Sequence, residues 1–270
     1  MPTKALLFFL AACLLLFACA PSYPKATITK SVEKILRAEH HLEGRAQLVG
    51  KTLYLDIQLP ELAGLKSEVP KEAMKKLEGA VLSVTRASLS SDADIQFMAV
   101  NAEIPKFNLR VHVLQRLADI KFFLYQKISK NDYEERTVID IYPLKSNVNV
   151  RRYEDVSLET FVSLLIVSQI NMLTRVNPFV GSALHNAKLT LAGISGGTLF
   201  VDVSDRLTPE LTALWSEIIT EKSLKIALKY GRFLPEKILL QDNSGATFPV
   251  SLFPGASTLS KFSAKILKNR

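Results

Sequence analysis

The chain has 270 residues, which is enough for one large domain or two smaller ones. Hydrophobic residues make up 48% of it, and glycine and proline, with 11 and 12 copies, are not enriched, so the composition excludes a disordered or low-complexity protein. The formal net charge is +8, and the basic runs at Lys75-Lys76, Arg151-Arg152 and Lys261 to Arg270 lie far apart in the sequence. No basic-aromatic motif accompanies this charge, so it argues against a nucleic-acid partner. The positive charge is compatible with a solvated basic face, or with contact to anionic lipid headgroups or anionic polymers.

The N-terminal segment has the features of a secretory signal. Lys4 provides a positive start, and Ala5 to Leu16 form an apolar run. A helix needs roughly 20 residues to cross a bilayer, so this run is too short to span one. The segment therefore predicts a signal peptide over residues 1–18 rather than a transmembrane anchor.

The end of the apolar run carries a more specific motif. Leu16-Phe17-Ala18-Cys19 resembles the lipobox of bacterial lipoproteins, in which a small residue directly precedes a cysteine. In that family the cysteine is acylated, with palmitate among the usual fatty acids, and becomes the mature N-terminus. The resemblance therefore implies lipidation of Cys19. The alternatives are an ordinary signal peptide cleaved near Ala18 or Ala20, and an uncleaved anchor.

The predicted lipobox has consequences for the stability and the localisation of the protein. Of the two cysteines, Cys13 would leave with the signal and Cys19 would carry the lipid, so the mature chain would have no internal disulfide. In the lipoprotein family of enteric bacteria, a residue such as Ala20 after the cysteine directs the protein to the outer membrane, provided that the source has two membranes. Residues 19–27 then form a short lipidated tether with two prolines.

The first half of the remaining chain predicts a domain over residues 28–145. Apolar side chains at helical spacing indicate helices over 28–42 and 71–90, and a third helix that carries Leu117 and Ile128. Strands are expected at 50–57, 95–102, 108–113 and 137–142, because apolar and polar residues alternate there.

The second half predicts another domain over residues 155–270. Helices are expected over 158–176, with Ser157 as N-cap, and from Thr208-Pro209 onwards; the interruptions by polar residues favour a buried helix over a membrane span at 158–176. Strands are expected at 188–191, 196–203, 224–230, 237–240 and 247–253, with a turn at 243–245. The amphipathic, basic stretch 257–270 predicts a terminal helix docked on this domain or resting on an anionic membrane surface.

The two halves share a short sequence match. Gly50 to Ile57 reads GKTLYLDI and Gly196 to Val203 reads GGTLFVDV, with similar helices on either side. We therefore predict an α+β fold of two diverged helix-strand-helix-strand modules that arose by internal duplication. Their sheets would be mixed or antiparallel, with helices packed on one face. The rival is one continuous mixed sheet made from both halves.

Candidate catalytic residues are few. Gly193 to Gly197 match the G-x-S-x-G pattern around Ser195, but a nucleophile elbow needs a helix after the serine, and here a strand follows, so a hairpin turn explains the glycines better. Asp56 and Asp202 are weak candidates because they match each other across the repeat. The four histidines, His40, His41, His112 and His185, lack a metal-ligand spacing, so neither a metal nor another cofactor is predicted.

Three functions are compatible with these observations. The first is a lipid-anchored, non-enzymatic interaction or assembly module of the cell envelope with a protein partner; its architecture is similar to the accessory lipoproteins of outer-membrane assembly machines. The second is an envelope protein that binds a lipid or another amphiphile in an apolar cavity. The third is an envelope hydrolase whose site combines residues such as Asp56, Asp202 and one histidine. A packed interior with exposed apolar side chains would favour the first.

Overall fold

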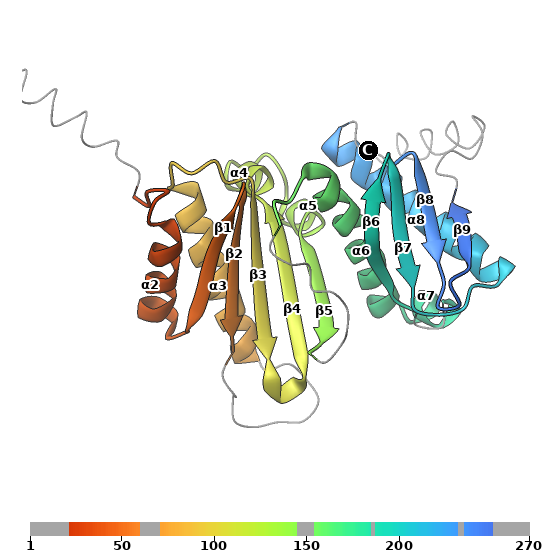
Figure 1. Cartoon of the computed structure of the whole chain (residues 1–270), viewed down its shortest axis with the longest axis horizontal. Helices are drawn as coiled ribbons and strands as arrows, with labels where there is room; N and C mark the ends of the chain where they lie inside the picture. Colours follow the sequence, from red (N-terminus) through yellow and green to blue (C-terminus); the bar gives the residue numbers. More distant parts are fainter. Residues whose placement is uncertain (1–21, 60–70, 145–153, 185–186, 232–234, 251–270) are drawn as a thin grey trace, which may run out of the picture. The chain divides into compact units, whose positions relative to one another are not determined.

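A computed structural model describes residues 22–59, 71–144, 154–184, 187–231 and 235–250 (Figure 1). The predicted signal peptide, Cys13, Cys19, His185 and the C-terminal stretch 257–270 lie outside these residues. The chain divides into two compact units. Unit 1 comprises the chain up to Ser129 together with Ile141–Asp155, and unit 2 comprises Lys130–Asp140 together with the chain from Val156. Residues 130–140, which we expected in the first domain, thus belong to the second unit.

Unit 1 contains a mixed five-stranded sheet with the strand order β1-β2-β3-β4-β5. β1 and β2 are antiparallel, β2 and β3 are parallel, and β3 and β4 are antiparallel. The division between the units falls within β5. The strands are β1 (Gly44–Val49), β2 (Thr52–Gln58), β3 (Phe97–Ile104), β4 (Leu109–Arg116) and β5 (Val138–Pro143).

Two long helices cover one face of this sheet, α2 (Ile28–His40) and α3 (Lys71–Leu89), and a short helix, α4 (Leu117–Leu124), follows β4 (Figure 1). The helix α2 forms because Ile28, Val32 and Leu36 recur at helical spacing, and all three are fully buried. On β2 the alternate residues Leu53 and Leu55 are also fully buried. The core of unit 1 therefore lies between the helices and this face of the sheet.

Unit 2 contains a separate mixed four-stranded sheet with the order β6-β7-β8-β9. Its strands are β6 (Leu189–Ser195), β7 (Thr198–Val203), β8 (Lys237–Gln241) and β9 (Thr247–Val250). Its helices are α5 (Lys130–Glu134), α6 (Leu158–Val176), α7 (Pro178–Ala183) and α8 (Pro209–Tyr230). The predicted caps are confirmed, because Ser157 accepts a hydrogen bond from the amide of Thr160, and Thr208 accepts one from the amide of Leu211.

These two sheets confirm the α+β class, and the rival prediction of one continuous sheet is wrong. In both units a helix precedes a hairpin, a second helix follows, and two further strands pair in the same directions; only the sheet of unit 1 has a fifth strand, β5. The matched segments occupy the same place: Gly50 and Gly196 both have positive φ, 56° and 52°, in the hairpin turn. This shared order is what duplication would produce; duplication itself stays a prediction.

Three expectations need correction. Residues 224–230 are the last part of α8 and not a strand, because Ile219, Ser223 and Ile226 are buried at helical spacing whereas Leu228 is exposed. The strand β1 was not predicted, because its sequence lacks a clear alternation of apolar and polar residues. In the structure only Ala46 among its residues is buried. The helix α4 ends at Leu124, so Ile128 lies outside it.

The polar residues within α6 explain how an apolar helix sits inside a globular unit. Ser168 accepts a hydrogen bond from the amide of Ile139 (3.1 Å) and donates one to its carbonyl (2.9 Å). Asn171 pairs in the same way with the amide and carbonyl of Leu189, both at 2.8 Å. These side chains therefore satisfy strand backbone that would otherwise lack partners. Of the helices in the described ranges, none combines the length and the hydropathy that a membrane span requires.

The two hairpin glycines provide a matched stability test. Gly196→Ala is expected to lower the free energy of unfolding by about 1–2 kcal/mol, because a residue with a Cβ is strained at positive φ. Gly50→Ala is expected to cost more, since its Cβ would overlap the carboxyl group of Asp155, which accepts a hydrogen bond from the amide of Lys51 at 2.8 Å. Apart from the chain neighbours of Gly196, no atom of the described residues lies within 4 Å of the corresponding Cβ position there. Chemical denaturation of both variants would measure the difference, and equal losses would contradict this account.

Candidate functional site

The first sequence candidate, Asp56, lies on β2 in a row of polar side chains that runs across the sheet of unit 1. The parallel pairing with β3 places Asn101 opposite it, and the pairing of β3 with β4 places His112 opposite Asn101. The side-chain amide of Asn101 donates a hydrogen bond to Asp56 at 2.7 Å. Burial raises the pKa of Asp56 above its ordinary value, although this hydrogen bond opposes the shift. Two residues further along β3, Glu103 forms an ion pair with Arg110 on β4 at 2.5 Å.

The other two sequence candidates lie in unit 2 in different surroundings. Asp202 occupies the position on β7 that Asp56 occupies on β2, but it is exposed, and it faces Thr190 and Gln241 on the neighbouring strands. Ser195 is the last residue of β6 and pairs with Thr198 across the hairpin turn. The segment is thus a hairpin, as predicted, and Ser195 does not sit on a strand-to-helix elbow. The structure brings neither residue together with Asp56 inside one unit.

The described histidines occupy structural positions. The Nε2 atom of His40 lies 2.8 Å from the hydroxyl of Ser83 on α3. His41 ends α2 in the left-handed conformation, with φ of 53°. His112 lies on β4 as stated above. Within the described ranges no three histidine, cysteine or carboxylate side chains come close enough to hold a metal ion.

Unit 2 contains a groove that was not predicted from the sequence. Exposed apolar side chains and charged side chains line it. It has a volume of about 320 Å³ and is bounded by α6, α8 and residues 130–136, which comprise α5 and the two residues after it and are called the α5 segment. Met172 and Val176 on α6 are 51% and 67% exposed and lie one helical turn apart, so they form a small continuous apolar surface beside the groove. The lining residues are Asn131, Glu134, Glu135, Gln169, Met172, Leu173, Val176 and Lys222.

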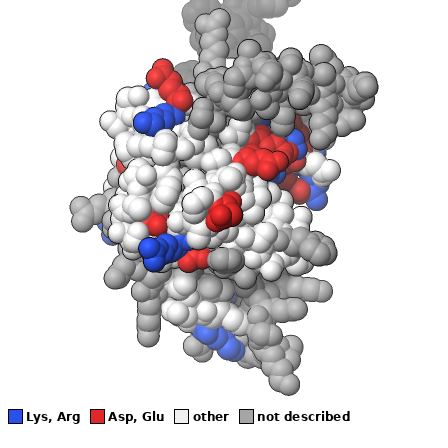
Figure 2. Space-filling model, turned by 90° about the vertical axis from the view of Figure 1, so that its right-hand side faces the viewer, with Lys and Arg blue, Asp and Glu red and all other residues white. Residues whose placement is uncertain are grey.

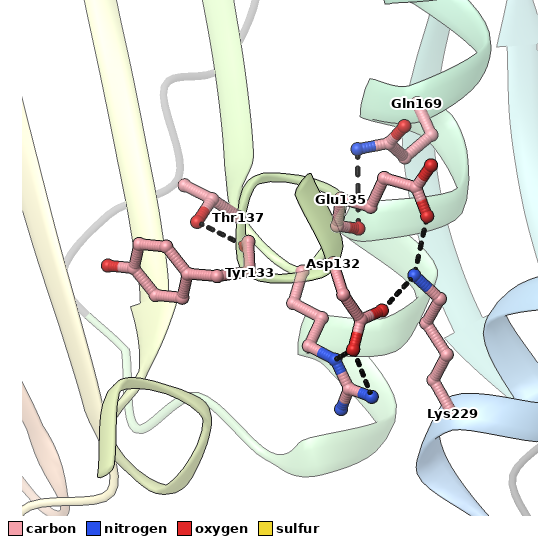
Figure 3. A network of polar contacts seen from close by, with 7 residues as sticks. Asp132, Tyr133, Glu135, Thr137, Gln169 and Lys229 are labelled. Atoms are coloured by element: carbon pink, nitrogen blue, oxygen red, sulfur yellow. Dashed lines mark hydrogen bonds and ion pairs between the residues drawn. The ribbon is translucent and has the colours of Figure 1, made fainter. Parts of the chain in front are cut away.

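One wall of the groove is held by a network of ion pairs around Lys229 (Figure 3). The Lys229 ammonium lies 2.5 Å from Asp132 and 2.6 Å from Glu135, and Arg136 also pairs with Asp132 at 3.2 Å. The Gln169 side chain donates a hydrogen bond to the Glu135 carbonyl at 3.3 Å. The α5 segment is too short to be stable by itself, so these contacts with α6 and α8 fix its position.

The pKa values of the two carboxyl groups reflect this network. Burial alone would raise the pKa of Asp132, but hydrogen bonds from Lys229 and Arg136 outweigh it and place the pKa below its ordinary value. The hydrogen bond from Lys229 lowers the pKa of Glu135 as well. Both groups are therefore ionised at neutral pH, and the network consists of full charges.

A second cavity in unit 2, of about 440 Å³, lies at the C-terminal end of α6 and contains two cationic residues, Arg175 and Lys188. Burial lowers the pKa of the Lys188 ammonium, and the nearby charge of Arg175 lowers it further. The remaining lining residues are Asn171, Thr174, Pro178, Ser182 and Ala187. This lining is mixed in polarity, in contrast to the apolar cavity that an amphiphile-binding protein would need.

The charged side chains on the face shown in Figure 2 are dispersed. Lysine and arginine appear there as small separate groups among uncharged surface and acidic side chains. The described part of this face therefore does not form the broad basic patch that binding to an anionic polymer would require.

Comparisons with known proteins do not add a relative. No family model matches the chain, and neither curated proteins nor solved structures give a match. The function of the chain is therefore inferred from its own residues.

Proposed function

We propose that the protein is a lipid-anchored protein of the cell envelope, acylated at Cys19, that acts as a non-enzymatic interaction or assembly module. Where the source has two membranes, we place it at the outer membrane, with its folded units in the periplasm. The lipobox-like motif Leu16-Phe17-Ala18-Cys19 supports the anchor. The groove of unit 2 supports a role in protein interaction.

The exposure of Met172 and Val176 beside the α5 segment is the observation that carries this proposal. A stretch of apolar surface with a polar rim is typical of protein–protein interfaces. On the opposite side of this part of α6, Ile170 and Thr174 are buried, so the exposed side chains are not part of the core. We infer a partner segment with apolar side chains for this surface.

Crosslinking in the native organism tests the proposal. A photoreactive amino acid at position 172 is expected to give a stoichiometric adduct with one protein, and the adduct is expected to be depleted in a Cys19→Ser variant. The same amino acid at the exposed position 228 on α8 is the matched control and should not give that adduct. Adducts with lipid alone, or none from position 172, would overturn the interaction role.

A further inference from the structure

The last turn of α4 and the residue that follows it form an exposed apolar turn in unit 1. In the sequence Lys121-Phe-Phe-Leu-Tyr-Gln-Lys127, the side chains of Phe122, Leu124 and Tyr125 are 39%, 57% and 71% exposed. The chain turns back at Gln126, where φ is 55°. Three large apolar or aromatic side chains thus project from one short turn, although the core of unit 1 lies elsewhere.

The flanking charges give this turn a distinct chemistry. Lys121 and Lys127 bracket the apolar residues, and both are exposed. The Lys127 ammonium lies 5.9 Å from the centre of the Phe122 ring, so it stays near the apolar side chains. Aromatic rings beside lysine are typical of surfaces that enter the headgroup region of a membrane, where rings bury their apolar part and ammonium groups meet anionic lipid.

The position of the turn in the fold links it to the proposed lipid anchor. The amide of Tyr23 donates a hydrogen bond to the carbonyl of Ser90, in the loop between α3 and β3. The amide of Leu117, the first residue of α4, donates one to the carbonyl of Gln96 at the end of the same loop. The start of the folded chain and the helix that bears the turn therefore lie at one end of unit 1 (Figure 1).

One of the acidic residues of this loop is paired with a cation: Asp94 lies 2.9 Å from Lys51. Asp92 accepts a hydrogen bond from the amide of Lys25 at 2.5 Å and keeps its negative charge. A lipid on Cys19, four residues before Tyr23, would bring this end of unit 1 to the bilayer surface. One short tether and one apolar turn at the same end provide two membrane contacts, and two contacts fix an orientation that a tether alone leaves free.

We propose that Phe122, Leu124 and Tyr125 insert into the interface of an anionic bilayer, while Lys121 and Lys127 bind its headgroups, so that unit 1 stands on the membrane by its α4 end. This inference rests on the proposed lipid anchor at Cys19. Two lysine contacts with anionic headgroups are weak compared with an acyl chain, so the turn adds orientation to the anchor rather than replacing it.

Site-directed spin labelling of the full lipidated chain tests the inference. Because Cys13 would be removed and Cys19 acylated, Leu124→Cys introduces a single free thiol for the label, and Leu82→Cys on an exposed face of α3 is the matched control. In vesicles of phosphatidylglycerol and phosphatidylethanolamine, the label at 124 should be more accessible to oxygen than to a water-soluble nickel chelate. The label at 82 should show the reverse. Both sites are exposed, so both variants are expected to fold, which circular dichroism would check.

The outcomes separate the inference from its premise. The intact mass of the same sample shows whether Cys19 is acylated, and an unacylated chain would overturn the anchor and the inference together. A lipidated chain whose label at 124 is as accessible to nickel as the label at 82 would overturn the inference alone. A label at 124 that stays in water, with a protein crosslinked to that position in cells, would assign the turn to a protein partner instead.

Discussion

Trp215→Ala is expected to lower the free energy of unfolding by about 3–5 kcal/mol, the usual cost of removing a large aromatic side chain from a packed core. Trp215 on α8 is 1% exposed and is among the largest fully buried side chains of the residues that the structure describes. It is also the single tryptophan of the chain, so unfolding of the variant has to be followed by far-UV circular dichroism during chemical denaturation. A loss below about 1 kcal/mol, the size typical of surface substitutions, would contradict the placement of Trp215 in the core.

Two further substitutions on α8 are matched controls for this prediction. Leu228→Ala should change the free energy of unfolding by no more than about 0.5 kcal/mol, because Leu228 is exposed in the helix. Ile226→Ala should cost roughly 2–5 kcal/mol, because Ile226 is buried. In a strand over 224–230 the two side chains would share one face and show similar costs. Similar losses from both would therefore contradict the helix.

The prediction of a strand over residues 224–230 was wrong because two periodicities coincide in this segment. Leu224, Ile226 and Leu228 alternate as in a strand, yet Ser223, Ile226 and Ala227 also follow helical spacing from Ile219. The tertiary structure decides between them. β7 and β8 are parallel neighbours, and parallel neighbours need a long crossover connection, which α8 provides in full. That pairing could not be read from the segment itself.

The parts of the fold that were predicted correctly carry strong local signals. Long helices with buried stripes, such as α2 and α6, were found from periodicity, and the matching strands that follow Gly50 and Gly196 were found from the similarity of their sequences. The strand β1 was missed because it is an edge strand, in which few residues need to be apolar. Sequence patterns therefore identify elements that bury a whole face and fail for those that bury little.

The candidate site shows the same limit more sharply. Asp56 could be singled out because it recurs as Asp202, but its partner Asn101 lies on another strand and carries no local signal. The groove depends on α5, a helix of five residues, and on contacts between Lys229 and residues more than 90 positions earlier. Neither a short helix nor a distant ion pair leaves a periodic pattern in the sequence. Exposure of Met172 and Val176, which defines the groove, becomes visible only once the packing of α6 is known.

Lys229→Met is expected to destabilise unit 2 by about 1–3 kcal/mol. Lys229 is only 17% exposed, so its removal would leave Asp132 and Glu135 without their shared counter-ion in a partly buried place. Breaking a fully buried pair in this way costs about 3–5 kcal/mol and an exposed pair less than about 1 kcal/mol, and this network lies between the two. Thermal and chemical denaturation at neutral pH would measure the loss, and Lys237→Met on β8 is the control with the same change in charge.

The pH dependence of this loss identifies its origin. The folded-state pKa values of Asp132 and Glu135 lie below their ordinary values of 3.8 and 4.5. Their contribution to stability is therefore complete above those ordinary values and is lost as the pH falls through the lower folded-state values. The difference in stability between the protein and Lys229→Met should accordingly be largest at neutral pH and shrink in acid, while the difference for Lys237→Met should not follow this course. A loss that is the same at neutral and acidic pH would mean that Lys229 stabilises α5 through the packing of its aliphatic chain, and not through its charge.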